Sequence, residues 1–364
     1  MKYKIAIPLF FIKKGQIGGA EEMAYNLVKA LADSAIIDVY LNNKESLSAD
    51  FVRFCQKKEV NFILISKNYS RFFLELLFPI IFRKKKYDLV LHLNYFMTPF
   101  SFLIAKKVFT VIHDLQYLHL RNNFPFIKRV WLYLNHINSL LFSSSVIAIS
   151  DFVLDDINKK FSFLPMKKVF RLYNIIDFNP SKYEKSKVEK VVKKYALCIS
   201  ANYQHKNINT LINAFQKSNL NKTHSLVLIG QRSENLLGFH SKVTTKNCED
   251  GKIIFTGYIK EKEKLDYIRN CDLFCFPSLF EGFGMPVVEA MKFNKPILCS
   301  DIKVLREISN NTCNYVGKPH LIDSWVEKLN EYLNESDSFK SGEYQDVLDR
   351  YSKKTIAREL VNRL

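Results

Sequence analysis

The chain has 364 residues, more than one hydrophobic core usually organises, so its length predicts two domains. Hydrophobic residues make up 48% and charged residues 25%, a balance that fits a packed soluble protein and argues against disorder. The net charge of +18 suits an anionic partner, namely nucleic acid, a membrane surface or a phosphorylated substrate, unless it only reflects a basic proteome.

The first elements of the chain predict a Rossmann-like unit. The apolar run at residues 4–9 predicts a buried strand and is too short for a signal peptide. A loop with Gly15, Gly18 and Gly19 follows, and residues 20–31 have the apolar spacing of a helix. Strand, glycine loop and helix in this order open such a unit, although the glycine spacing is not the dinucleotide-binding fingerprint.

Further short apolar runs in the first half of the chain predict the other strands of a parallel sheet. Polar residues bound each run, and helical stretches lie between them. The predicted strands are residues 36–41, 61–65, 89–93, 109–112, 145–149 and 168–172.

A second unit of similar construction follows a polar, lysine-rich segment at residues 181–194, which is the predicted linker. Helices are expected at residues 209–216 and 262–269. The predicted strands are residues 196–200, 225–229, 252–256, 273–276 and 296–299. Two successive β/α units predict an α/β fold with two Rossmann-like, doubly wound parallel-sheet domains that face across a cleft.

Three segments make up the predicted domain organisation. Residues 1–178 form the N-terminal domain, residues 179–351 form the C-terminal domain, and a terminal helix at 352–364 packs back towards the N-terminal domain. Residues 1–180 carry 25 Lys and Arg against 14 Asp and Glu, whereas the remainder carries 29 against 22. The positive charge is therefore biased towards the N-terminal half.

Two stretches combine apolar and basic residues. Residues 71–86 have an apolar body between basic flanks, far shorter than the roughly 20 residues of a membrane span. They fit either an interfacial segment on anionic headgroups or a core helix whose basic end complements the helix dipole. Residues 124–142, with Lys128, Arg129 and Trp131, are a second such candidate.

The number and spacing of the seven cysteines indicate neither a disulfide framework nor a zinc site. Their number is odd, and they are spread along the chain from Cys55 to Cys313. Cys271 and Cys275 form the one close pair and lack a second pair of ligands. Buried free thiols are therefore expected.

The strongest signal is the segment Phe-Pro-Ser-Leu-Phe-Glu-Gly-Phe-Gly-Met-Pro-Val-Val-Glu-Ala-Met at residues 276–291. It predicts a strand, a glycine-punctuated loop and a helix that begins near Pro286, since proline suits the first helical turn. The free N–H groups and positive dipole end of a helix N-terminus suit a diphosphate. Gly282 and Gly284 let the backbone approach a ligand closely.

The pattern Glu-Gly-Phe-Gly-x-x-x-x-Glu-Ala resembles the signature of family 4 retaining glycosyltransferases, which have the GT-B fold. Other segments match in the same order over nearly the whole chain. The resemblance implies that Glu281 contacts hydroxyls of the donor sugar and that Glu289 hydrogen-bonds the ribose. It also implies that the backbone between them holds the sugar and the phosphates, at Phe283, Gly284, Met285, Pro286 and Val287. Val287 is the better donor because proline has no N–H.

A second matching segment, residues 198–215, resembles the family's strand, loop and helix around a Lys-Asn pair. The resemblance implies that Lys206 neutralises charge on the departing nucleotide diphosphate. Many relatives also carry an arginine in this loop, where Asn202 and His205 stand here. Arg232 is a candidate substitute for the missing cation.

In the N-terminal half, Val-Ile-His-Asp-Leu-Gln follows a predicted strand, and open α/β sheets bind ligands at such strand ends. The segment resembles the family's His-Asp segment, which implies that His113 contacts the donor sugar in the cleft. Asp114 either caps the following segment or orients His113. Gly18 and Gly19 match the family's glycine loop near the phosphates and the acceptor.

The resemblance implies transfer with retention at the anomeric carbon by front-side attack, with the leaving phosphate accepting the proton. No cofactor and no metal are expected, and the chain has no Asp-x-Asp motif. The His-Asp-Leu-Gln segment looks most like mannosyl- and rhamnosyltransferases, so transfer of a hexose or 6-deoxyhexose is expected. The expected acceptor is a glycan, especially a lipid-linked saccharide of O-antigen or capsule type.

The expected partners are therefore a nucleotide-sugar, that acceptor and an anionic membrane surface, without nucleic acid. The expected location is the cytoplasm, peripheral on the inner face of the cytoplasmic membrane. Two alternatives stay open. A nucleotide-sugar epimerase has the same architecture but lacks the Glu-Gly-Phe-Gly segment. A nucleic-acid-binding protein is suggested by charge alone, because the lysines are dispersed rather than interleaved with aromatic residues.

Overall fold

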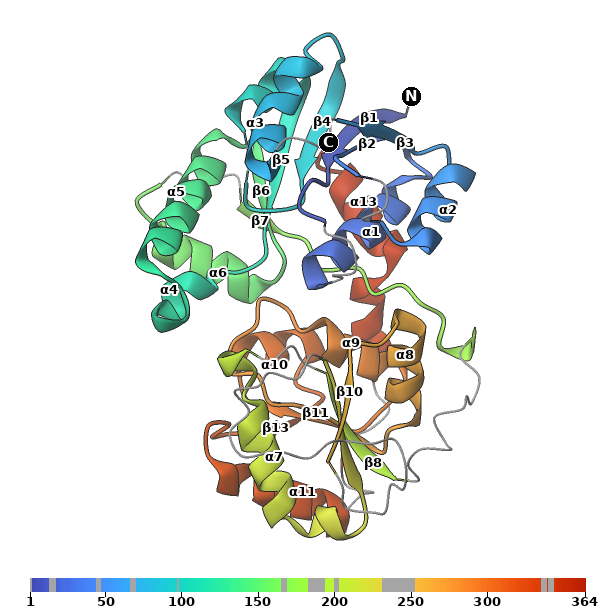
Figure 1. The fold of residues 1–364 in the computed structure, drawn as a ribbon, viewed down its shortest axis with the longest axis vertical. Coiled ribbons are helices and arrows are strands. Elements are labelled where there is room, and N and C mark those ends of the chain that lie inside the picture. The colour runs from blue at the N-terminus through green and yellow to red at the C-terminus, as the bar shows by residue number, and fades with distance from the viewer. Residues whose placement is uncertain are drawn as a thin grey trace. The chain divides into compact units, whose positions relative to one another are not determined.

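The computed structural model describes residues 2–12, 18–43, 47–65, 70–96, 98–164, 169–182, 194–199, 203–230, 253–334, 339 and 344–364. The chain forms two compact units (Figure 1). Unit 1 comprises Met1–Asp177 and Arg350–Leu364, and unit 2 comprises Phe178–Asp349. The chain thus passes from unit 1 to unit 2 one residue before the boundary expected from the sequence.

Unit 1 contains a sheet of seven parallel strands in the order β3-β2-β1-β4-β5-β6-β7. The strands are β1 (Tyr3–Pro8), β2 (Ala35–Leu41), β3 (Asn61–Leu64), β4 (Tyr87–His92), β5 (Ala105–Ile112), β6 (Ser145–Ala148) and β7 (Val169–Arg171). Each overlaps a strand predicted from its apolar run. The strand order reverses between β1 and β4, which makes the sheet doubly wound and confirms a Rossmann-like unit.

The helices of unit 1 come from the N-terminal half of the chain, except for the C-terminal helix α13. They are α1 (Gly19–Leu31), α2 (Ala49–Lys57), α3 (Arg71–Ile81), α4 (Gln116–His119), α5 (Phe126–Phe142), α6 (Asp151–Lys160) and α13 (Lys353–Val361). The C-terminal helix α13 packs against α1, and the Nζ of Lys107 donates to the carbonyl oxygen of Arg363 over 3.2 Å. The last residues of the chain therefore belong to the same unit as the first.

Helix α3 accounts for most of the apolar and basic stretch at residues 71–86. Leu74 and Phe78 are buried and belong to a cluster with Ala6, Tyr40 and Val90 of the sheet. The other side of the helix is not covered in the same way, since Ile81 is 55% exposed. The core-helix interpretation therefore accounts for the buried face of this segment.

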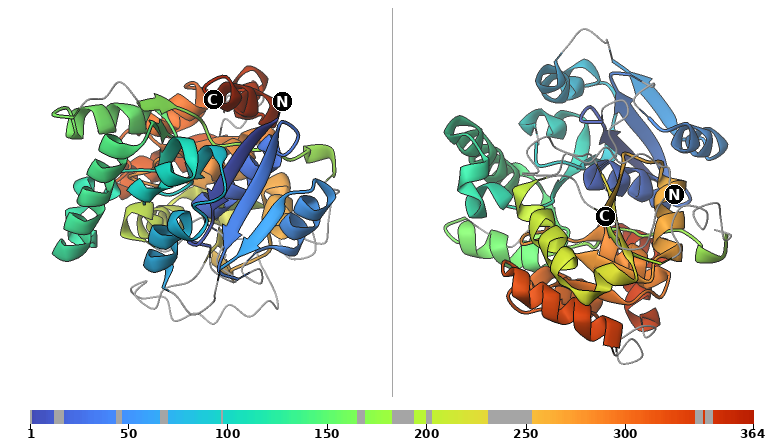
Figure 2. Two further views of the ribbon diagram at one scale, coloured as in Figure 1. Left: turned by 90° about the horizontal axis from the view of Figure 1, so that it is seen from above. Right: turned by 60° about the horizontal axis from the view of Figure 1, so that its bottom comes forward.

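The C-terminal end of helix α6 meets α5 at the outer edge of unit 1 (Figure 2). The ring of Phe161, at the end of α6, stacks on Tyr133 of α5 with the centroids 5.3 Å apart. Among the described residues, no helix is both long and apolar enough to cross a membrane.

Unit 2 contains a sheet of six parallel strands in the order β10-β9-β8-β11-β12-β13. The strands are β8 (Tyr195–Ile199), β9 (Ser225–Ile229), β10 (Ile253–Gly257), β11 (Leu273–Phe276), β12 (Ile297–Ser300) and β13 (Asn314–Val316). The sequence did not predict β13, because Asn314, Tyr315 and Val316 do not form an apolar run. The strand order reverses between β8 and β11, so unit 2 is also Rossmann-like.

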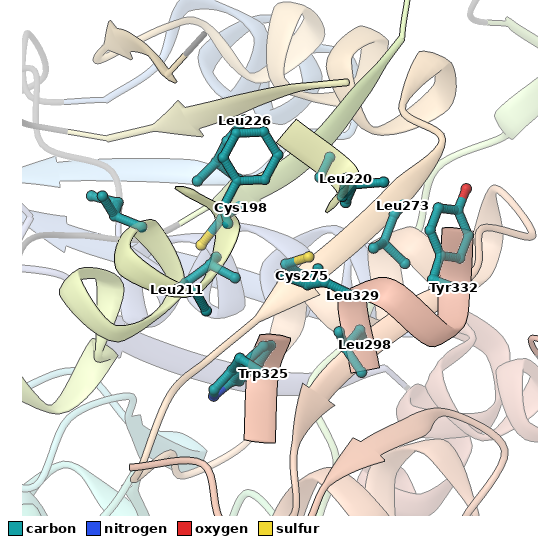
Figure 3. Close-up of a cluster of buried hydrophobic side chains, with 14 of the residues drawn as sticks. Cys198, Leu211, Leu220, Leu226, Leu273, Cys275, Leu298, Trp325, Leu329 and Tyr332 are labelled. Carbon is teal, nitrogen blue, oxygen red and sulfur yellow. The ribbon is translucent and has the colours of Figure 1, made fainter. Parts of the chain in front are cut away.

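In the part of unit 2 that the structure describes, six α-helices surround the sheet. They are α7 (Ile208–Lys217), α8 (Glu261–Asn270), α9 (Met285–Lys292), α10 (Lys303–Ser309), α11 (Ile322–Asn334) and α12 (Gln345–Leu348). Helices α7 and α11 cover one face, where Leu211 and Trp325 meet Cys275 and Leu298 of the strands (Figure 3). Side chains alternate along a strand, so Phe276 points to the other face, where α9 lies.

The cysteines in the described part of the chain are all free and buried: Cys55, Cys198, Cys271, Cys275, Cys299 and Cys313. This agrees with the expected buried thiols. The predicted linker at 181–194 lies largely outside the described residues.

Candidate active site

The topology of unit 2 places two loops at one point of the sheet. Strands β8 and β11 are neighbours, but the chain continues from β8 to α7 on one face and from β11 to α9 on the other. Loops that leave neighbouring strands in opposite directions open a crevice at the carboxyl ends, where open α/β sheets bind ligands. Lys206 follows β8, and Glu281 follows β11.

The structure brings Lys206 and Glu281 into direct contact. The Nζ of Lys206 donates to the Oε1 of Glu281 over 2.5 Å, and the two side chains are only 19% and 13% exposed. The backbone N–H of Leu279 donates to the carbonyl oxygen of His205 over 2.7 Å, which ties the two loops together. Two of the residues implied to be catalytic, 75 positions apart in sequence, therefore form one ion pair.

His205 stands beside this ion pair and is uncharged at neutral pH. Burial, together with the positive charge of Lys206, lowers the pKa of His205 to about 4. Its ring stacks on Tyr203 with the centroids 5.7 Å apart. At neutral pH the loop after β8 therefore presents the charge of Lys206 and not a histidine cation.

Gly284 shapes the loop between β11 and α9. It is the N-cap of α9 and has a φ of +109°, a conformation that favours glycine. A Cβ at this position would lie 2.9 Å from the Cδ2 of Leu305 and 3.1 Å from the Cδ1 of Ile308. Glycine is thus required here both by the backbone and by the packing of α10.

Helix α9 begins near Pro286, as the sequence predicts. The helix begins at Met285, one residue before Pro286, which lies in its first turn. The side chains of Phe283, Met285 and Val287 are buried and anchor the loop. The N–H of Val287 donates to the carbonyl oxygen of Gly284 over 3.0 Å, so a phosphate bound by Val287 would have to share this N–H.

Glu289 lies on α9 and is only 2% exposed. Its Oε1 accepts from the Nζ of Lys264 over 2.8 Å, and Lys264 also binds the Oε1 of Glu261 over 2.9 Å. The Oε2 of Glu289 is buried and has no hydrogen-bond partner among the described residues. Burial raises the pKa of Glu289, while Lys264 acts against this shift. The site thus holds an unused carboxylate oxygen, an acceptor suited to a hydroxyl donor.

Lys264 is the residue of this site that the sequence did not reveal. It lies on α8, 25 positions before Glu289, in a helix rich in charged residues. Nothing in its local sequence distinguishes it from Lys262 on the same helix, which is exposed. Only the packing of α8 against α9 shows the contact.

In unit 1, His113 lies at the carboxyl end of β5. Its Nε2 is 2.9 Å from the carbonyl oxygen of Leu93, which follows β4 at the reversal point of that sheet. Burial lowers the pKa of His113. The neutral ring therefore donates from Nε2 to Leu93, which leaves Nδ1 as an acceptor. The Oδ1 of Asp114 accepts from the N–H of Gln116, the first residue of α4, over 2.8 Å.

The remaining predicted positions fall into two groups. Gly18 and Gly19 lie at the start of α1, where the N–H of Gly18 donates to the Oε2 of Glu21 over 3.0 Å. Asn202 and Arg232 lie outside the described residues, so their roles stay predictions.

The two halves of the chain match two family models. Residues 17–179 match the model described as Glycosyltransferase Family 4, and residues 181–355 match Glycosyl transferases group 1. The O-antigen chain mannosyltransferase RfbU of Salmonella typhimurium is 26% identical over 223 residues, 61% of this chain and 60% of the relative. The O-antigen chain mannosyltransferase B of Escherichia coli is 28% identical over 134 residues, 36% and 34% of the two chains. The matches therefore span about 60% and one third of the length of these relatives.

A solved structure shows the same architecture over the full length. The structure of Anabaena HepE in complex with UDP and glucose has a TM-score of 0.74 and covers 99% of both chains at 17% identity. At this identity the likeness establishes the fold, which is GT-B. Because family models match both halves of the chain and both halves have the expected sheets, the chain belongs to the family 4 glycosyltransferases.

Proposed function

We propose that this chain transfers a hexose or 6-deoxyhexose from a nucleotide-sugar to a glycan acceptor, with retention and without a metal ion. The observation that carries the proposal is the arrangement at the sheet reversal of unit 2. There, the Lys206–Glu281 ion pair lies at the ends of two neighbouring strands, and α9 carries a buried carboxylate with an unused oxygen. The donor thus meets a cation, a carboxylate for its sugar and an acceptor for its ribose.

In the proposed reaction, Lys206 and Glu281 separate when the donor binds. Glu281 accepts hydrogen bonds from hydroxyls of the sugar, and the ammonium group of Lys206 turns to the diphosphate. A fixed cation stabilises the negative charge that develops there as the glycosidic bond breaks. The acceptor hydroxyl bonds to the anomeric carbon on the face that the diphosphate leaves, and a phosphate oxygen takes the hydroxyl proton. Retention follows from attack on that face.

Two further residues would orient the donor. The Oε2 of Glu289 would accept a hydrogen bond from a ribose hydroxyl, while Lys264 holds the other oxygen. His113 would meet a sugar hydroxyl with its free acceptor nitrogen, Nδ1, since Nε2 is held by Leu93. Both residues bind and orient, and neither has to carry a proton.

Mannose or rhamnose is the favoured sugar, and a lipid-linked saccharide is the favoured acceptor. The support for mannose is that both curated relatives described above are O-antigen chain mannosyltransferases. A lipid-linked acceptor places the reaction at an anionic membrane, and the positive charge concentrated in residues 1–180 would attract the chain to it. The enzyme would then work on the inner face of the cytoplasmic membrane.

The first arm of the test measures thermal stabilisation by UDP, GDP, dTDP and ADP. We expect one nucleotide, GDP if the sugar is mannose, to raise the unfolding temperature by several degrees, because ligand at about 100 times Kd adds about 2.7 kcal/mol of stability. Glu289→Gln should lose most of this effect, whereas Glu263→Gln, at an exposed position on α8, should keep it. No stabilisation by any nucleotide would contradict the proposal.

The second arm measures transfer from the matching nucleotide-sugar in the presence of EDTA. We expect Lys206→Met to lower kcat by about 100-fold, as for loss of one group that stabilises transition-state charge. The anomeric configuration of the product, read by NMR, should equal that of the donor. An inverted product would reject the front-side mechanism, and loss of activity in EDTA that added divalent metal restores would reject metal independence.

A further inference from the structure

Helix α5 of unit 1 has apolar side chains on two opposite faces. One face packs into the unit: Leu132, His136 and Leu140 are buried, and His136 stacks on Tyr95 and Tyr117. The other face is exposed, with Ile127 at 82% and Leu134 at 58%. The exposed apolar face consists of Phe126, Ile127, Val130, Trp131, Leu134, Leu141 and Phe142.

The spacing shows that these exposed side chains share one side of the helix, on which Asn138 also lies. At about 100° per residue, they all lie within an arc of roughly 160° around the helix axis. The buried residues occupy the opposite arc. A surface helix normally carries polar residues on the side that faces water. An exposed apolar side therefore indicates an interaction site for a protein or a membrane.

The charges around the helix indicate the chemistry of that partner. Residues 115–150 contain no Asp and no Glu but include Arg121, Lys128 and Arg129. The Nζ of Lys128 lies 5.4 Å from the ring centre of Phe124, and the guanidinium of Arg129 lies 5.6 Å from that of Phe126. The cations thus border the apolar face at one end. Aromatic and aliphatic side chains bordered by basic residues complement an anionic lipid surface.

We propose that α5 docks this chain on an anionic phospholipid bilayer. The helix lies in the plane of the surface with its apolar face among the headgroups and upper acyl chains. Its 17 residues span about 25 Å along the membrane. Trp131, on the same face, sits at the depth that tryptophan favours at membrane interfaces. The proposal deepens the proposed function, because a lipid-linked acceptor requires the enzyme at that surface.

The test uses Trp131 as its own probe. The chain has two tryptophans, and the second, Trp325, is fully buried in the core of unit 2. We expect the fluorescence emission of the full chain to shift to the blue on addition of vesicles of phosphatidylglycerol and phosphatidylcholine. Phosphatidylcholine alone should give a much weaker shift. Co-sedimentation with the same vesicles measures the partition coefficient.

Two pairs of substitutions separate α5 from other exposed apolar residues. Ile127→Gln with Leu134→Gln should weaken partition into anionic vesicles at least tenfold. Phe73→Gln with Ile81→Gln, on the exposed side of α3, should leave it unchanged, although these side chains are 52% and 55% exposed. No vesicle binding by the unsubstituted chain, or an equal loss in both double variants, would overturn the proposal.

Two more readouts complete the experiment. A lipid-independent dimer that the α5 double variant abolishes would also overturn the proposal, because the apolar face would then bind a second copy. Nucleotide stabilisation without vesicles should be retained in the α5 double variant, which shows that the variant is folded. Absence of nucleotide stabilisation in the unsubstituted chain would reject the donor site, while vesicle binding would still decide the role of α5.

Discussion

Lys264 and Glu289 show how a single contact can determine the chemistry of a site. A carboxylate that is 2% exposed would favour its protonated form, because burial raises its pKa. The ammonium group of Lys264 opposes this shift and fixes Oε1, so that Oε2 is left to accept a hydrogen bond. Lys264 is thus a positioning residue for Glu289 and need not touch the donor itself.

We therefore predict that Lys264→Met weakens nucleotide binding at least tenfold at pH 7 and moves its pH dependence. Without the cation, the pKa of Glu289 rises, so protonation abolishes the charge-assisted hydrogen bond to ribose at a higher pH than in the unsubstituted chain. The measurement is nucleotide Kd against pH by calorimetry. Lys262→Met, on the exposed side of α8, is the control, and a pH profile identical to that of the control would argue against this role.

At the level of elements, the conformation of the loop between β11 and α9 depends on buried side chains as well as on its glycines. The side chains of Phe283 and Met285 point into the unit, and Gly284 turns the chain with a positive φ against α10. The rigid loop presents its backbone at the strand ends. This explains why a short glycine motif at 282–284 is informative: the glycine that starts the helix has no room for a side chain.

Gly284→Ala should lower the free energy of unfolding by about 3 kcal/mol. The substitution adds a methyl group 2.9 Å from Leu305 and forces alanine into a positive φ. Urea denaturation measures the loss. Gly317→Ala is the matched control, since no atom lies within 4 Å of a Cβ at that position and the expected change is within about 0.5 kcal/mol. A similar loss in both variants would contradict the packing argument.

At the level of the whole molecule, stability depends on pH because burial lowers the pKa of four of the described histidines: His92, His113 and His136 of unit 1 and His205 of unit 2. Burial lowers the pKa of His92 to about 3 and that of His136 to about 4. In the unfolded chain a histidine titrates near pH 6.5. Between that pH and the lowered value, the unfolded chain binds protons that the folded chain does not, so acid favours unfolding.

Stability should therefore fall as the pH is lowered from 6.5 towards 4, by up to ~1.4 kcal/mol per pH unit for each of these histidines. Urea unfolding of the full chain at pH 7 and pH 5 measures this slope. His136→Phe, which can keep the stacking on Tyr95 and Tyr117, should remove the contribution of one of these histidines. His320→Gln, at an exposed position, should leave the slope unchanged. A His136→Phe variant with the full slope would show that His136 does not contribute.

The amino-acid sequence by itself determined the strands of both sheets, apart from β13, and the family. Buried parallel strands can be recognised as short apolar runs between polar turns. The glycine loop with its two glutamates can likewise be recognised from consecutive residues, so both are local features of the chain. The sequence also marked Lys206 and Glu281, but as separate positions.

Only the tertiary structure decided which of these positions meet. It paired Lys206 with Glu281 across 75 residues and placed Lys264 on Glu289. It also buried one face of each of the helices α3 and α5 and left apolar side chains exposed on the other. The two apolar and basic stretches look alike in composition, and which of their side chains are buried depends on which ones the neighbouring strands and helices cover. Contacts between distant segments follow from strand order and helix packing, which no local pattern of residues encodes.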